Sequence, residues 1–225
     1  MNQEQWSRVD QYLVDLLVHP DPMFEAALKA SDAAGLPQIQ VAPNQGKFLM
    51  LLAQAQGARR ILEIGTLGGY STIWLARALP SDGRLVTLEA VPTHATVARN
   101  NIERAGFAKV AEVRLGRALE TLPQLAAEGL GPFDFIFLDA DKRTYPEYLE
   151  WCIKLSRRGT MIVADNVVRD GAVVDSASRD ADVRGVRRFL ERLSTDPRVS
   201  ATAIQTVGSK GYDGIALAVI TEEPY

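Results

Sequence analysis

The sequence is poor in the residues that build disulfides and zinc sites. It contains one cysteine, Cys152, and two histidines, His19 and His94, which lie far apart along the chain. A single cysteine cannot form an internal disulfide, so a reducing compartment, the cytoplasm, is expected. Zinc prefers sulfur and imidazole ligands, and these three scattered residues predict no zinc site.

Long hydrophobic runs and an excess of positive charge are also missing. No apolar run approaches the ~18 residues of a membrane-spanning helix. Residues 1–6 have neither the basic region nor the apolar core of a signal peptide. The net charge of −3 provides no basic surface for nucleic acid. We therefore expect a globular protein of 225 residues that binds neither membranes nor nucleic acids.

From residue 61 onward, strand-like and helix-like segments alternate. Apolar, strand-like runs occupy 61–65, 84–89, 111–115, 133–139 and 160–165. Helix-like segments occupy 70–79, 92–105, 117–128, 143–156 and 180–195. This alternation predicts a mainly parallel sheet with helices on both faces. Two β-rich runs, 199–207 and 214–220, flank a turn-like segment at 208–213 and predict a closing hairpin.

Three helical segments precede the first strand, at 2–18, 22–34 and 43–56. We expect one domain over 1–225, in which residues 1–57 form a helical extension and residues 58–225 form the α/β core. The extension could be a cap or a dimerisation element. Equally, its helices could simply cover one face of the sheet, and the sequence leaves both roles open.

A glycine-rich turn follows the first strand, which is the usual opening of a nucleotide-binding α/β domain. In the dinucleotide fingerprint a second glycine lets the backbone approach a pyrophosphate, but Leu67 occupies that place here. Glu63, just before the turn, would repel a phosphate and suit an ammonium or sulfonium group. Glu89, at the end of the next strand, can accept hydrogen bonds from both hydroxyls of a ribose. Together these residues favour S-adenosylmethionine over the alternative, a dinucleotide such as NAD bound by a dehydrogenase.

A second group of polar residues lies at the ends of later strands. Asp139 ends the run at 133–139, and Asp165 with Asn166 ends the run at 160–165. Oxygen ligands that converge from adjacent strand ends suit a hard divalent cation. The pattern therefore predicts one such cation, with Mg²⁺ favoured and Ca²⁺ or Mn²⁺ as alternatives.

Three segments carry a resemblance to a known family. They are the run at 62–71, the run at 133–142 with its Asp-Ala-Asp-Lys end, and the pair Asp165-Asn166. From about residue 41 to 220 the sequence resembles the cation-dependent O-methyltransferases of the caffeoyl-CoA and catechol type. The resemblance implies a Rossmann-like class I methyltransferase fold, with a seven-stranded sheet in the order 3-2-1-4-5-7-6 and strand 7 antiparallel. It also implies a homodimer.

The same resemblance assigns roles to individual residues. Lys142 matches the catalytic lysine of the family, and Asp139, Asp165 and Asn166 match its metal ligands. The positions implied for S-adenosylmethionine are Val41, Glu63, Gly65, Thr66, Tyr70, Ser71, Glu89, Ala90, Gly116, Ala118, Asp139 and Tyr148.

The acceptor is expected to be a small aromatic molecule with two adjacent hydroxyls. A neutral Lys142 could take the hydroxyl proton, and burial beside the metal is expected to lower its pKa toward that role. In the family the acceptor pocket comes from segments equivalent to 39–43, 167–178 and 209–213. Tyr212 is a candidate for stacking on the ring, and Arg169 either contacts an acidic acceptor or is solvated. Another phenol or natural-product hydroxyl as acceptor, and a non-catalytic binder of the cofactor, are the remaining alternatives.

Overall fold

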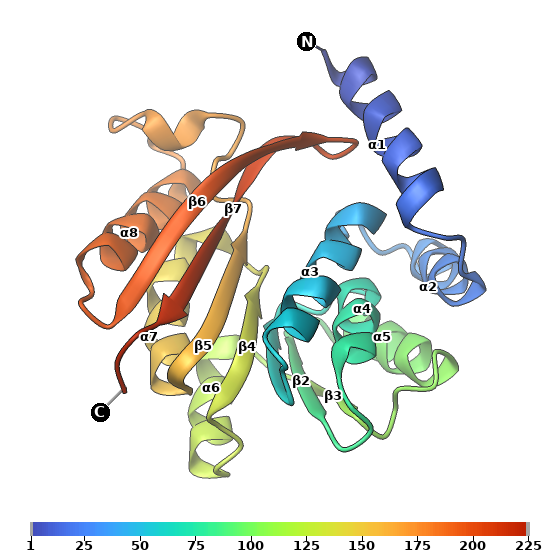
Figure 1. Cartoon of the computed structure of the whole chain (residues 1–225), viewed down its shortest axis with the longest axis horizontal. Coiled ribbons are helices and arrows are strands. Elements are labelled where there is room, and N and C mark those ends of the chain that lie inside the picture. Colours follow the sequence, from blue (N-terminus) through green and yellow to red (C-terminus); the bar gives the residue numbers. More distant parts are fainter. Residues whose placement is uncertain (1, 224–225) are drawn as a thin grey trace.

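The computed structural model describes residues 2–223 and contains a seven-stranded sheet between layers of helices (Figure 1). The strands are β1 (Arg60–Ile64), β2 (Arg84–Glu89), β3 (Ala111–Leu115), β4 (Phe133–Leu138), β5 (Ser156–Asp165), β6 (Val199–Gly208) and β7 (Gly211–Ile220). The helices are α1 (Gln3–Leu17), α2 (Pro22–Ala33), α3 (Pro43–Ala55), α4 (Tyr70–Ala78), α5 (Pro92–Arg104), α6 (Ala118–Ala127), α7 (Tyr145–Lys154) and α8 (Ala181–Thr195). Two short 3-10 turns are η1 (Lys142–Thr144) and η2 (Ala172–Val174).

The strand order β3-β2-β1-β4-β5-β7-β6 confirms the predicted Rossmann-like fold. Strands β1 to β5 are parallel, and β7 is antiparallel to both β5 and β6. The order reverses at β1, which pairs with β2 on one side and β4 on the other. At such a reversal the connections leave in opposite directions and open a crevice at the carboxyl ends of the strands.

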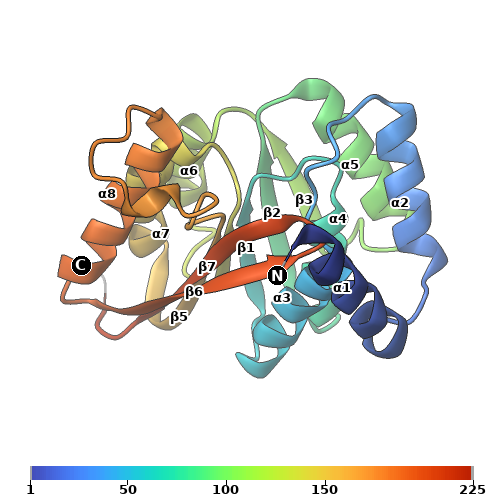
Figure 2. The same cartoon turned by 90° about the horizontal axis from the view of Figure 1, so that it is seen from above.

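Two hydrophobic clusters form the core, one on each face of the sheet. Figure 2 shows the helices on the two sides of the sheet. Helices α6, α7 and α8 pack with Leu62 and Ile136 on one face, and α3, α4 and α5 pack with Ile61 and Phe135 on the other. Adjacent residues of one strand enter different clusters because side chains alternate across a strand. Burial on both faces explains why the central strands are almost continuously apolar in sequence.

The N-terminal helices divide between the two roles that the sequence left open. Helix α3 packs on α4, and α2 packs on α4 and α5, so these two thicken the helical layer on one face. Helix α1 instead contacts α3 and lies beside the tip of the β6–β7 hairpin, away from the central strands of the sheet (Figures 1 and 2). None of the helices within residues 2–223 is both long enough and apolar enough to cross a lipid bilayer.

Two predicted boundaries were wrong. Strand β5 begins at Ser156 rather than at Thr160, because a register shift between Phe133 and Phe135 of β4 lets the polar residues before the apolar run join the ladder. The hairpin turn is shorter than 208–213, since Gly208 already pairs with Gly211. Tyr212 therefore lies in β7 rather than in the turn.

Candidate active site

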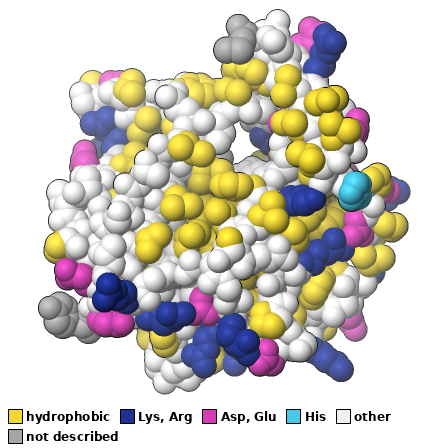
Figure 3. Space-filling model, in the orientation of Figure 1, with side chains coloured by type: hydrophobic (Ala, Val, Ile, Leu, Met, Phe, Trp, Pro, Cys, Tyr) yellow, Lys and Arg dark blue, Asp and Glu magenta, His cyan; other side chains and the backbone are white. Residues whose placement is uncertain are grey.

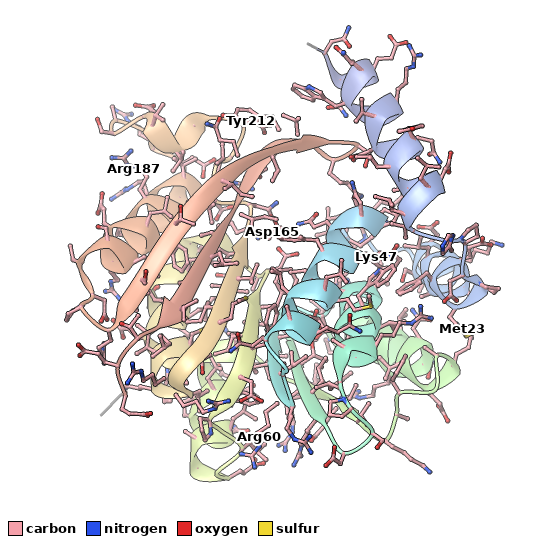
Figure 4. All side chains as sticks on the ribbon, viewed as in Figure 1. Met23, Lys47, Arg60, Asp165, Arg187 and Tyr212 are labelled. Carbon is pink, nitrogen blue, oxygen red and sulfur yellow. The ribbon has the colours of Figure 1, made fainter. Side chains whose placement is uncertain are left out.

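A cavity of about 530 Å³ opens at the carboxyl ends of the parallel strands. Residues that follow β1, β2, β3 and β4 line it, and the segment before α3 and the loop after β5 complete its wall. Figure 4 shows Asp165, the last residue of β5, near the centre of the molecule. Arg60, the first residue of β1, lies toward the opposite end of the parallel strands. The cavity therefore occupies the crevice that the strand order creates.

The structure brings all but one of the predicted cofactor residues to this cavity. Those that line it are Val41, Gly65, Thr66, Tyr70, Ser71, Glu89, Ala90, Gly116, Ala118, Asp139 and Tyr148. They come from six separate segments of the chain, which only the folded sheet places together.

Glu63 is the exception, because it is fully buried beneath the glycine turn. The hydroxyls of Ser71 and Thr87 each donate to its carboxylate at 2.6 Å, and Thr72 donates as well. Burial raises the pKa of Glu63 to about 7, against the lowering effect of these hydroxyls. Since Ser71 both donates to Glu63 and lines the cavity, Glu63 orients the start of α4 rather than facing a ligand directly.

The glycine turn itself is fixed by close backbone contacts. Gly65 has φ 104°, and a Cβ there would lie 1.9 Å from the carbonyl oxygen of Asp139, so only glycine fits. The backbone N–H of Leu67 donates to Glu89 at 2.8 Å, and that of Val91 donates to the other carboxylate oxygen at 2.8 Å. The turn amide at Leu67 is thus engaged by a carboxylate and is not free for a phosphate, which agrees with the preference for S-adenosylmethionine over a dinucleotide.

The predicted metal ligands lie at the neighbouring ends of β4 and β5. Asp139 and Asn166 line the cavity, and Asp165 is buried. Burial, and then the charge of Asp139, raises the pKa of Asp165 to about 7. Two crowded carboxylates and an amide oxygen fit a hard divalent cation, whose charge would relieve their repulsion. Among the described residues, no group of three or more His, Cys, Asp or Glu side chains is placed to hold a metal, so water or substrate oxygens would complete the coordination.

Lys142 is buried at the edge of the cavity beside these carboxylates. Its Nζ donates to Asp139 at 2.7 Å. Burial acts to lower the pKa of Lys142, but Tyr145 and then Asp139 outweigh it, so the pKa lies above its ordinary value. The expected lowering of the Lys142 pKa referred to burial beside a bound metal, and it stays a prediction for the metal-bound site.

The two residues named for acceptor binding have different positions. Arg169 lines the cavity, whereas Tyr212 is not among the described residues that line it. The shorter hairpin turn moves Tyr212 into β7, where its hydroxyl donates to Gln205 of β6. Ring stacking by Tyr212 is therefore not supported.

The sequence did not predict two sets of polar contacts that join the N-terminal helices to the later part of the chain. Gln45, on α3, donates its side-chain amide N–H to the Oδ2 of Asp165 at 2.6 Å, although the two residues are 120 positions apart in sequence. Asp10, on α1, accepts from the Asn44 side chain at 2.9 Å and from the backbone N–H of Ser209 at 2.6 Å. No local sequence pattern pointed to the contacts of Gln45 or of Asp10.

Comparison with known proteins agrees with this geometry. The catechol O-methyltransferase of Niastella koreensis is 54% identical over 220 residues, which cover 98% of this chain and 100% of that protein. The structure of the O-methyltransferase from Bacillus cereus in complex with S-adenosylhomocysteine is 59% identical, with a TM-score of 0.97 over 98% of this chain and 100% of that one.

An O-methyltransferase of Streptomyces achromogenes involved in tomaymycin synthesis, solved with S-adenosylmethionine, is 52% identical, with a TM-score of 0.95 over 98% of this chain and 99% of that one. The profile of the O-methyltransferase family matches residues 19–220, a range that contains the whole sheet and all of the cavity wall. With its strand order, its cavity and its relatives in agreement, the chain belongs to the O-methyltransferase family.

Proposed function

We propose that this protein transfers a methyl group from S-adenosylmethionine to one hydroxyl of a small aromatic vicinal diol, with the help of a divalent cation. The observation that carries the proposal is the group formed by Asp139, Asp165, Asn166 and Lys142, which stands at the cavity edge beside the cofactor residues. The likeness to a catechol O-methyltransferase supports the same acceptor class.

One part of the cavity, at the ends of β1, β2 and β3, is proposed to hold the methyl donor, and we call it the cofactor half. Its carboxylate, Glu89, accepts two backbone N–H groups but keeps lone pairs for ribose hydroxyls. S-adenosylmethionine, when bound, supplies a methyl group activated by a positively charged sulfur. The proposed binding set is Val41, Glu63, Gly65, Thr66, Tyr70, Ser71, Glu89, Ala90, Gly116, Ala118, Asp139 and Tyr148, with Glu63 acting through Ser71.

The other part, at the ends of β4 and β5, is proposed to hold the acceptor, and we call it the acceptor half. Asp139, Asp165 and Asn166 would hold one cation, with Mg²⁺ as the first candidate and Ca²⁺ and Mn²⁺ as alternatives. The cation, when bound, supplies positive charge that favours the phenolate form of the acceptor. Lys142 is proposed as the base. With the charge of Asp139 offset, burial of Nζ favours the neutral amine that can take the proton.

A methylation assay tests the proposal. Catechols and matched phenols with a single hydroxyl would be incubated with S-adenosylmethionine, in Mg²⁺ and in EDTA, and the products identified by mass spectrometry. We expect methylation of the diols in Mg²⁺, a strong loss in EDTA and little product from the single phenols. If single phenols are methylated equally well, the acceptor is a phenol of another kind, such as the natural-product hydroxyl suggested by the Streptomyces relative. If no diol reacts under any metal condition, the proposed activity fails.

We also propose that the protein is a homodimer of single-domain chains, in which residues 1–57 extend the core at 58–225. Figure 3 shows hydrophobic side chains gathered on the face that presents α1, α3 and the hairpin. The exposed apolar residues there are Val9, Tyr12, Leu13, Leu16, Leu17, Phe48, Leu51, Ile204 and Val207. Exposed apolar surface of this kind favours association. Sedimentation of the Leu16→Glu variant should show monomers if the face pairs two chains, and an unchanged mass would exclude α1 from the interface.

The buried free thiol of Cys152 needs no oxidising compartment, which supports a cytoplasmic location. The charge balance supports small-molecule substrates over nucleic acid.

A further inference from the structure

Arg169, in the loop after β5, lies on the wall of the cavity. Its backbone has the unusual φ of 56°, and Asn166 and Asp170 nearby have φ of 57° and 54°. Non-glycine residues adopt such angles only where the surroundings enforce them. Here Asp213 on β7 accepts the backbone N–H groups of Val168 and Arg169, each at 2.9 Å. The side chain of Arg169 thus projects from a backbone that is fixed by hydrogen bonds.

The guanidinium of Arg169 lacks close hydrogen-bond partners among the described residues. Its Nε is buried and has no hydrogen-bond partner among the described residues. Its Nη1 lies 3.9 Å from the Oδ2 of Asp213, which is too long for a hydrogen bond. The other oxygen of Asp213 is already occupied by backbone N–H groups, including that of Gly214 at 2.9 Å. Asp213 therefore holds the loop backbone, while the guanidinium N–H groups of Arg169 have no hydrogen-bond acceptor among the described residues.

Other charged groups on the cavity wall have closer partners. Lys142 donates to Asp139 at 2.7 Å, and Asp182 lies 3.4 Å from the guanidinium of Arg143. His94 lies 3.6 Å from Glu89. Of the lysine and arginine residues described on this wall, Lys142 and Arg169, Arg169 has the longer ion-pair distance. A guanidinium on a cavity wall whose terminal N–H groups have no hydrogen-bond acceptor among the described residues is complementary to a carboxylate, which can accept two parallel hydrogen bonds from them.

We propose that Arg169 binds an anionic substituent of the acceptor, so that the preferred acceptors are aromatic vicinal diols with a carboxylate on the ring or on a short side chain. This inference rests on the proposed function, since Asn166 at the start of the same loop belongs to the acceptor half. Arg169 is a specificity-determining residue in this arrangement. It fixes the far end of the acceptor while the diol faces Lys142 and the carboxylates.

The test compares an acid with its neutral analogue, 3,4-dihydroxybenzoate with 3,4-dihydroxybenzamide, at fixed free Mg²⁺. In the Arg169→Gln variant we expect kcat/KM for the acid to fall about 10- to 100-fold, mainly through KM, while the amide is little affected. Arg169→Lys should retain part of the preference. Each variant is measured with the same two acceptors. Their intrinsic difference in phenol acidity therefore cancels when the acid-to-amide ratio of kcat/KM is compared between a variant and the wild type.

Arg187→Gln is the matched control. Its side chain donates to the carbonyl of Val173 at 2.6 Å, so its loss disturbs the same loop without removing the proposed anion contact. The acid-to-amide ratio should stay at the wild-type value in this variant. Calorimetry of 3,4-dihydroxybenzoate with protein loaded with S-adenosylhomocysteine gives a second readout, in which Arg169→Gln should weaken binding by a similar factor.

The outcomes separate this inference from the proposed function. If both acceptors are methylated but Arg169→Gln lowers them equally, or changes neither, the anion contact is wrong and the methyltransferase activity stands. If Arg187→Gln changes the ratio as much as Arg169→Gln, the effect belongs to loop structure and the inference is overturned. If neither acceptor is methylated by the wild type, the proposed function fails, and an Arg169-dependent loss of acid binding by calorimetry would still support the anion contact.

Discussion

At the glycine turn of the cofactor half, polar contacts join residues close in sequence, whereas some contacts at and near the acceptor half join segments far apart. Ser71 reaches Glu63 across 8 positions, and Leu67 reaches Glu89 across 22. Gln45 reaches Asp165 across 120 positions, and Ser209 reaches Asp10 across 199. The contacts at the turn lie within two successive strand–helix units. The distant contacts depend on how α1 and α3 pack against the ends of the later strands and the hairpin.

This difference separates the binding site of the cofactor, which stays the same, from the binding site of the acceptor, which can vary. A site built within neighbouring strand–helix units keeps its geometry as long as those units pack, so it suits a cofactor that never changes. A site assembled from distant loops can change acceptor when one loop changes, and loops tolerate such change. Arg169 lies on a loop of this second kind, held by Asp213 of β7.

The largest expected effect lies in the acceptor half. Lys142→Ala should lower turnover about 10²- to 10⁴-fold, the usual contribution of a positioned acid or base. Binding of S-adenosylhomocysteine, measured by calorimetry, should stay unchanged because the cofactor half is intact. Lys154→Ala, which removes an exposed lysine that stacks on Trp151, is the control and should behave as the wild type. Equal losses of turnover and cofactor affinity would break the division between the halves.

The next effect lies in the cofactor half and concerns stability. The pKa of Glu63 is raised from 4.5 to about 7, so the folded state holds the proton more tightly than the unfolded chain. The contribution of Glu63 is therefore fully present below pH 4.5 and is lost as the pH rises to about 7. Between these limits the wild type should lose about 3 kcal/mol of unfolding free energy relative to Glu63→Gln, at 1.36 kcal/mol per unit. Urea titrations across this range measure the difference.

The stability prediction has an internal control. Glu112 is partly exposed and its pKa is lowered despite the opposing effect of burial, because Arg84 and Arg114 pair with it. Glu112→Gln should therefore not reproduce the pH dependence of Glu63→Gln. Parallel stability curves for the wild type and Glu63→Gln would contradict the buried, protonatable state of this carboxyl.

A smaller effect is expected on cofactor affinity. Glu89→Ala removes the acceptor of the Leu67 and Val91 N–H groups and the proposed partner of the ribose. Hydrogen bonds to charged groups contribute about 1.5–3 kcal/mol, so the Kd for S-adenosylhomocysteine should rise about 10- to 100-fold. Calorimetry measures the Kd, and steady-state kinetics at saturating S-adenosylmethionine should show an unchanged KM for the acceptor. A change confined to the acceptor KM would reverse the assignment of the two halves.

The smallest effect sharpens the comparison at the edge of the acceptor half. Asp10→Ala removes the carboxylate that joins α1, Asn44 and the hairpin tip at Ser209. Losing such a contact costs about 1 kcal/mol where water can partly replace it, so amide exchange in α1 should speed up several-fold. Cofactor affinity should not change. Asp15→Ala, which removes an exposed partner of Gln11 on the same helix, is the control, and unchanged exchange in Asp10→Ala would show that α1 is held by other contacts.

Sequence reasoning was most reliable where local pattern fixes structure. The alternation of apolar strands and helices predicted the parallel sheet, and Leu67 and Glu89 pointed to the character of the turn before its contacts were seen. It failed for the start of β5, for the hairpin turn and for Tyr212, because a register shift and a tight strand pairing are decided by partners elsewhere in the chain.

By itself the sequence determined the alternating strands and helices of the sheet and the position of the cavity at the strand ends, and its resemblance to the family implied most of the residues that line the cofactor half. Periodicity and turn chemistry act over a few residues, and parallel strands bring their ends to one edge whatever the helices do. Only the tertiary structure decided that Glu63 is buried away from the cavity, that Gln45 reaches Asp165, and that Arg169 lines the cavity with its Nε unpaired among the described residues. These contacts depend on how distant segments pack, which no local pattern encodes.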